Sequence, residues 1–145
     1  MTRSHDPAPL IKASSAQAKS SNFKDAINTL KQALPLISGS PLSFGAASYS
    51  KIVPYFQKAG LYKEGLAYTL EILIPTGLQD IERKLSHVPE KNRNALSHAL
   101  LAEIYGKLRL IAQREGLIED RDVFLEKHKY HTESHRALMN ELYPR

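Results

Sequence analysis

Hydrophobic residues recur at helical spacing along most of the chain. The clearest case is residues 21–34, where Phe23, Ala26, Leu30 and Ala33 follow one another at steps of 3, 4 and 3 residues. Those steps place all four side chains on one side of an α-helix, with polar residues on the other side. Large and small side chains alternate along this stripe, so neighbouring helices can approach closely at the alanines. We therefore expect a helix that is packed between others.

The same periodicity predicts five further helices, at residues 8–20, 42–59, 60–75, 94–115 and 117–143. Pro54 falls inside the second of these and should kink it unless the helix begins late. Pro35 and Pro75 are expected at helix ends, and residues 80–85 either extend the helix past Pro75 or form a short helix of their own. No alternating run is long enough for a strand. The chain is therefore expected to be all-α, with three helical hairpins.

The segment from Gly60 to Pro75 repeats the pattern of the first helix described. When the two are aligned, Tyr62 falls on Phe23 and Gly65 falls on Ala26. An aromatic residue followed three positions later by a small one resembles the second helix of a tetratricopeptide repeat, a helix-turn-helix unit of about 34 residues.

The resemblance covers residues 8–75 and implies two tetratricopeptide-like hairpins followed by an elongated terminal pair. Such hairpins stack into a short α-solenoid, and a closed six-helix bundle is the alternative arrangement of the same stripes. The family binds partners on the concave surface made by the first helix of each hairpin.

Composition sets the broad class. The chain has 145 residues, of which 42% are hydrophobic, enough for one folded domain. Residues 1–7 are expected to be a disordered leader and residues 8–145 a single helical-repeat domain.

There are no cysteines, so disulfides and thiolate zinc sites are excluded. No apolar run reaches the length of a membrane span, and a cytoplasmic location is expected.

The net charge of +5 is concentrated in the first half, which carries eight Lys or Arg against four Asp or Glu in residues 1–75. No run of adjacent basic residues occurs, so nucleic acid is not the expected partner. A nucleic-acid face would require the first-half lysines to converge, namely Lys12, Lys19, Lys24, Lys31, Lys51, Lys58 and Lys63.

Three histidines share one face of the last predicted helix. His128, His131 and His135 follow at i, i+3 and i+7, beside Arg121 and Phe124, which form a candidate anchor pair for a partner. The spacing admits a half-buried polar helix face, a pH-sensitive groove because imidazole titrates near pH 6.5, or a metal site. Closed zinc sites need about four ligands, so no metal or cofactor is predicted.

No catalytic motif is present. Ser21-x-x-Lys24 and Ser48-x-x-Lys51 have the spacing of serine–lysine acyl enzymes but lack the accompanying motifs. The seven glycines form no phosphate-binding loop. The chain is therefore not expected to be an enzyme.

The preferred hypothesis is a protein-interaction module that binds a peptide or protein partner in a helical groove. An adaptor, a chaperone or an immunity-type protein would all fit, a homodimer is compatible, and the alternative is a nucleic-acid-associated helical regulator with a basic face. The candidate partner-binding residues are Lys12, Gln17, Tyr49, Lys51, Val53 and Phe56 on the first helices, with Arg121, Phe124, His128, His131 and His135 on the last.

Overall fold

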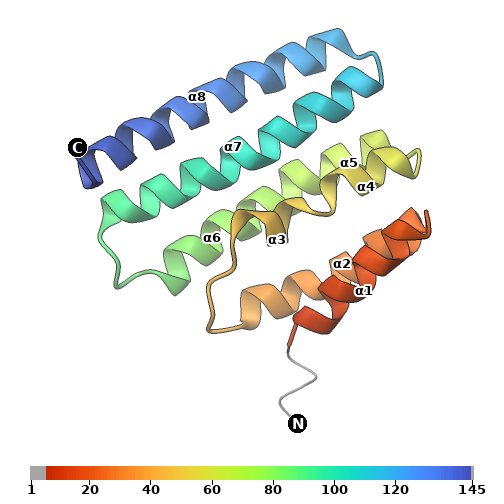
Figure 1. Cartoon of the computed structure of the whole chain (residues 1–145), viewed down its shortest axis with the longest axis horizontal. Helices are drawn as coiled ribbons and strands as arrows, with labels where there is room; N and C mark the ends of the chain where they lie inside the picture. Colours follow the sequence, from red (N-terminus) through yellow and green to blue (C-terminus); the bar gives the residue numbers. More distant parts are fainter. Residues whose placement is uncertain (1–5, 145) are drawn as a thin grey trace.

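A computed structural model describes residues 6–144, and every regular element in that part of the chain is a helix. The expected all-α class is confirmed. Figure 1 shows the helices side by side, with α1 and α2 at one end of the molecule and the long pair α7 and α8 at the other. Most of the expected leader, residues 1–5, lies outside the described residues; Pro7 is buried and directly precedes α1.

The first pair consists of α1 (Ala8–Lys19) and α2 (Phe23–Gly39), which pack on each other. The stripe expected on α2 is buried, since Ala26, Leu30 and Ala33 are at most 5% exposed. The helix runs on through Pro35 instead of ending there. Pro35 is exposed, so water can hydrate the carbonyl that a proline leaves without a donor.

The second predicted segment is a broken helix. It begins late, as α3 (Ala46–Ser50), and resumes after two residues as α4 (Val53–Lys58). Pro54 lies in the first turn of α4, where a backbone N–H has no intrahelical acceptor and proline costs nothing. The break therefore takes the place of the expected kink.

The next segment is one continuous rod made of α5 (Tyr62–Tyr68), a π-helical turn η2 (Thr69–Leu73) and α6 (Ile74–Lys84). The expectation that the helix closes at Pro75 is wrong, and the alternative extension through residue 84 is correct. In η2 the Ile74 N–H donates to the Thr69 carbonyl, five residues back. This wider turn shifts the hydrogen-bond register just before the proline, so the helix continues past it.

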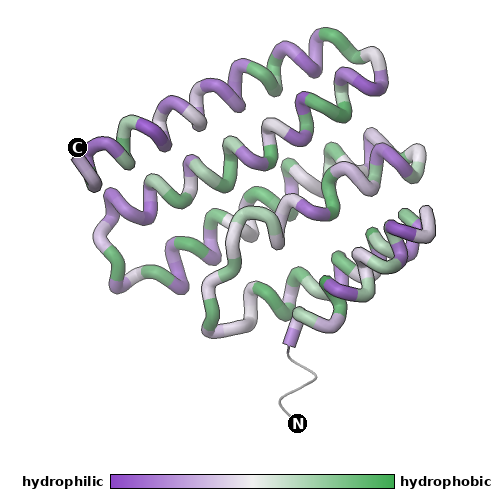
Figure 2. Tube along the Cα trace, in the orientation of Figure 1, coloured by the Kyte–Doolittle hydropathy of each residue, from purple (hydrophilic) through white to green (hydrophobic). Residues whose placement is uncertain are grey.

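The last two helices, α7 (Glu90–Arg114) and α8 (Ile118–Leu142), are antiparallel and meet at Gly116, whose φ of +73° suits glycine. Helix α7 packs against α3, α4 and α6 on one side and against α8 on the other. In Figure 2 hydrophilic residues recur along α8, and Phe124 is its only fully buried side chain within the described residues. No helix in residues 6–144 combines the length and apolar character needed to cross a bilayer.

The centre of the core is the contact between α4 and α5. Phe56 is 0% exposed and its ring lies 5.6 Å from that of Tyr68. The backbone of Gly65 lies so close that a Cβ there would be 2.3 Å from the Phe56 Cβ. Only glycine permits this approach, and it brings the second hairpin together around a large side chain.

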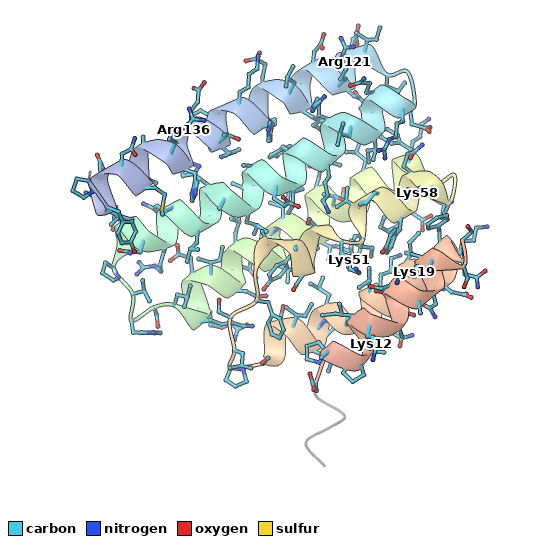
Figure 3. All side chains as sticks on the ribbon, viewed as in Figure 1. Lys12, Lys19, Lys51, Lys58, Arg121 and Arg136 are labelled. Carbon is cyan, nitrogen blue, oxygen red and sulfur yellow. The ribbon has the colours of Figure 1, made fainter. Side chains whose placement is uncertain are left out.

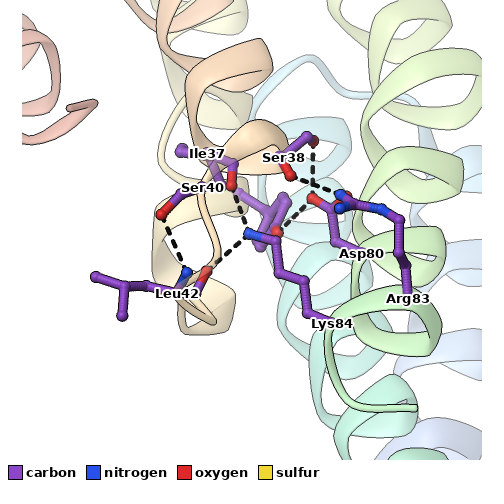
Figure 4. A network of polar contacts seen from close by, with 8 residues as sticks. Ile37, Ser38, Ser40, Leu42, Asp80, Arg83 and Lys84 are labelled. Atoms are coloured by element: carbon purple, nitrogen blue, oxygen red, sulfur yellow. Dashed lines mark hydrogen bonds and ion pairs between the residues drawn. The ribbon is translucent and has the colours of Figure 1, made fainter. Parts of the chain in front are cut away.

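A buried carboxylate joins three elements that are distant in sequence (Figure 4). Asp80 of α6 is 4% exposed, and its Oδ2 accepts hydrogen bonds from Ser38 Oγ at 2.8 Å and Tyr49 Oη at 2.7 Å. Its Oδ1 pairs with Arg83 at 3.0 Å. Burial and this carboxylate raise the pKa of Tyr49, which keeps the hydroxyl a donor. Lys84 adds hydrogen bonds to the backbone carbonyls of Ile37 and Leu42.

We expect Gly65→Ala to lower the free energy of unfolding by about 1–3 kcal/mol, because the new methyl group overlaps Phe56. Gly39→Ala is the matched control, since a Cβ at that position meets nothing within 4 Å. Urea unfolding monitored by circular dichroism measures both. Equal stability of the two variants would contradict the close packing described for α4 and α5.

Asp80→Ala should lower the free energy of unfolding by about 2–4 kcal/mol, because the hydroxyls of Ser38 and Tyr49 lose their acceptor. Glu82→Ala is the control on the same helix. That carboxylate is exposed and makes one ion pair, with Arg93, so its loss should cost no more than about 1 kcal/mol. The same urea experiment compares them, and a loss for Asp80→Ala as small as the control's would rule out the joining role.

Candidate protein-binding surface

The histidines predicted on one face of α8 point toward α7. The Nδ1 atom of His128 lies 2.8 Å from the Ala102 carbonyl, and Nδ1 of His135 lies 2.9 Å from the Ala95 carbonyl. A carbonyl oxygen only accepts, so each Nδ1 carries the proton and donates it. Gly106 makes room for this, because a Cβ there would stand 3.1 Å from two ring atoms of His128. These two rings therefore fasten α8 to the backbone of α7.

The third histidine pairs with one from α7. Nδ1 of His131 lies 2.9 Å from Nδ1 of His98, so one imidazole donates its N–H to the lone pair of the other. The ring of Tyr105 is parallel to His131, with centroids 5.8 Å apart, and Tyr130 meets it edge-on at 5.0 Å. Burial, then the neighbouring His98 and Lys127, lowers the pKa of His131. We refer to His98 and His131 as the imidazole pair.

A groove of about 510 Å³ runs along α7 beside these contacts. Its charged residues are Lys107, Arg109 and Glu103, and its one acid is already engaged: Glu103 accepts a hydrogen bond from Ser50 Oγ at 3.1 Å and lies 3.5 Å from Lys107. Since Lys107 is paired with this acid, Arg109 is the charged group of the lining that has no ion-pair partner within residues 6–144. The lining comprises Ala99, Ala102, Glu103, Gly106, Lys107, Arg109 and Leu110 from α7, and His128, Thr132 and His135 from α8.

Two polar atoms in the groove lining have unused hydrogen-bonding capacity. Arg109 Nε and Thr132 Oγ1 are buried and have no partner among the described residues. The guanidinium makes one long contact, 3.3 Å from Gln113 Oε1. Buried polar atoms are nearly always satisfied in folded proteins, so an acceptor supplied from outside would complete the hydrogen bonding of Arg109.

Further basic residues lie on α1, α3 and α4. Figure 3 labels four of them, Lys12 and Lys19 on α1, Lys51 after α3 and Lys58 at the end of α4. None of the four forms an ion pair with another residue in the range 6–144. The Lys58 ammonium lies over the ring of Phe23, 5.5 Å from its centroid. These lysines leave positive charge on the first helices of the first two pairs.

The remaining first-half lysines belong to other elements. Lys24 and Lys31 are on α2 and Lys63 is on α5. Lys31 is partly buried between two rings, 5.5 Å from the Phe56 centroid and 5.3 Å from that of Tyr68. The seven lysines that a nucleic-acid face would need are therefore divided among five parts of the fold, namely α1, α2, the turn after α3, α4 and α5.

Several candidate binding residues are structural. Val53, Phe56 and Phe124 lie in the core at 6% exposure or less, and Tyr49 is 4% exposed with its hydroxyl on Asp80. Gln17 accepts a hydrogen bond from Thr29 at 2.8 Å, which joins α1 to α2. A partner meets none of the four core side chains while the fold is intact. The candidates that remain accessible at the surface are Lys12, Lys51, Arg121, His128 and His135. Arg121 forms an ion pair with Asp122, and His128 and His135 line the groove.

The groove residues missed from the sequence are Lys107, Arg109, Thr132 and the pairing residue His98. A usable signal was the series Ala99, Ala102 and Gly106, small residues at helical spacing within α7, which marks a close helix contact.

Other chemistry is limited. No group of three or more His, Asp or Glu side chains in residues 6–144 is placed to hold a metal ion. Asp80 is buried with both oxygens engaged, so it is no candidate for acid–base catalysis. Comparisons with protein-family models, curated proteins and solved structures found no match.

Proposed function

We propose that this protein is a cytoplasmic protein-interaction module built of tetratricopeptide-like hairpins, and that it binds an acidic segment of a partner protein without catalysis. The observation that carries the proposal is the α7–α8 groove, in which Lys107 is paired with Glu103 whereas Arg109 has no ion-pair partner and its Nε lacks a hydrogen-bond partner within residues 6–144. A carboxylate of the partner supplies the missing acceptor.

The groove has the composition of an interaction site. Arginine is enriched at the energetic centres of interfaces because its planar group donates to carboxylates with two parallel hydrogen bonds. Leu110, which is 41% exposed at the groove, offers an apolar contact beside it.

The order of packing supports a repeat arrangement. Helix α2 packs on α4, and α4 packs on α7, so each pair contacts the next in sequence order, as hairpins in a solenoid do. Helix α8, with one buried side chain, has the polar outer face of a terminal capping helix.

A nucleic-acid-associated regulator is the second candidate. It is supported by Lys12, Lys19, Lys51 and Lys58, which form no ion pairs with described residues. The separation of the other three lysines onto α2 and α5 favours the first candidate. Adaptor, chaperone and immunity-type roles would all use the same groove.

Arg109→Glu should weaken binding of a glutamate-rich peptide at least about tenfold, because a hydrogen bond to a charged group contributes about 1.5–3 kcal/mol. Lys24→Glu on α2 makes the same charge change away from the groove and is the control. Titration of ¹⁵N-labelled protein followed by NMR gives the affinity, and the shift changes should map to the α7 and α8 groove residues.

The same titration with double-stranded DNA tests the second candidate. The second proposal would replace the first if DNA bound tightly, with an affinity that falls steeply with salt, and changed the chemical shifts of α1 and α4. In that outcome the groove residues would show no shift change with the peptide. Equal losses of peptide affinity for Arg109→Glu and Lys24→Glu would show non-specific charge attraction. That result would also contradict the first proposal.

A further inference from the structure

The contact between α7 and α8 contains a group whose geometry depends on pH. We propose that this contact is an acid-sensitive switch, in which full protonation of the imidazole pair, His98 and His131, releases α8 from α7 and removes one wall of the groove. The release is a property of the fold, whereas its meaning as control of partner binding rests on the function proposed above.

The switch follows from the proton count of the pair. With the two Nδ1 atoms 2.9 Å apart, one must carry a hydrogen and the other a lone pair. A first added proton is tolerated, because it enters at the Nε2 of the donor ring and leaves the N–H···N bond intact. A second proton places hydrogen on both Nδ1 atoms and two cations side by side, so the contact must open. Double protonation is therefore incompatible with this contact.

The side chains that lower the pKa of His131 are bases. Within residues 6–144 the charged groups acting on His131 are His98 and Lys127, and neither is a carboxylate. Tyr105 stacks parallel to the His131 ring, and the exposed Tyr130 meets it edge-on. Burial, and then the neighbouring His98 and Lys127, lower the pKa of His131 in the folded protein. A lowered folded pKa stabilises the contact above the unfolded value near pH 6.5, and that contribution is lost as the pH falls below it.

The other two histidines do not open the contact. His128 and His135 donate from Nδ1 to backbone carbonyls, and a proton added at Nε2 leaves those donors in place. Near them in the groove lie Glu103, Lys107 and Arg109. Protonation of His128 and His135 adds positive charge to the groove. The loss of attachment comes from the imidazole pair alone.

Apart from the bonds of His128 and His135 to α7 carbonyls, helix α8 has few buried contacts that could compensate for loss of the pair. Phe124 is its one fully buried side chain in the described part of the chain. Polar contacts secure its two ends, where Tyr62 Oη donates to Asp120 at 3.1 Å and Lys91 lies 3.4 Å from Glu141. If release takes up one proton, the opening equilibrium rises about tenfold for each pH unit below the pKa concerned.

Hydrogen exchange of the full chain tests the release, with amides of α2 as the internal reference and the intrinsic rates corrected for pH. From about pH 7.5 to about pH 5, wild-type α8 should lose at least about tenfold in protection relative to α2. His131→Phe keeps the ring against Tyr105 and removes the titration, so its protection should not change with pH. His98→Gln removes the other partner and serves as the second variant. His87→Gln, outside the contact, should respond like the wild type.

Unchanged wild-type protection of α8 over that range would overturn the proposal, as would a pH response in both His131→Phe and His98→Gln equal to the wild type's. Imidazole ¹⁵N spectra of the wild type give an independent readout, and doubly protonated His98 and His131 in a molecule whose α8 stays protected would also overturn it. No partner is present in these experiments. Failure therefore removes the switch and leaves the proposed binding function standing, while a failed peptide titration does the reverse.

Discussion

The buried carboxylate of Asp80 is the constraint on which the arrangement of the first helices depends. An ionised group this far from water is stable only when its oxygens accept several hydrogen bonds, and Ser38, Tyr49 and Arg83 supply them. Since those donors come from α2, α3 and α6, the need to satisfy one carboxylate sets the relative position of three helices. Hydrophobic burial alone would permit sliding of the same helices, because apolar contact has no preferred direction.

The helices are joined by two different kinds of contact. Around Phe56 and Gly65 the attachment is close apolar packing, which does not change with pH. Between α7 and α8 it is largely imidazole rings against backbone carbonyls and against one another. The groove that carries the functional proposal lies along this second kind of contact.

A backbone adjustment lets one helical rod reach both the apolar core and the hydrogen-bond network of Asp80. The π-helical turn before Pro75 keeps α5 and α6 in one rod, so that Gly65 near one end packs on Phe56 and Asp80 near the other reaches α2 and α3. A helix ended at the proline would separate those two contacts. The extra residue in the turn is thus part of how the core and the polar network coexist.

The sequence by itself determined the helical class and the helix boundaries near Gly60 and Gly116, because 3.6-residue periodicity and left-handed glycines are local signals. Only the tertiary structure decided that Tyr49, Val53 and Phe56 are core residues, since a helix with apolar residues on one side does not reveal which neighbour covers it. The same holds for the groove and for the imidazole pair, whose members lie 33 positions apart. Such contacts arise from the docking of whole helices, and no local pattern encodes which residues then meet.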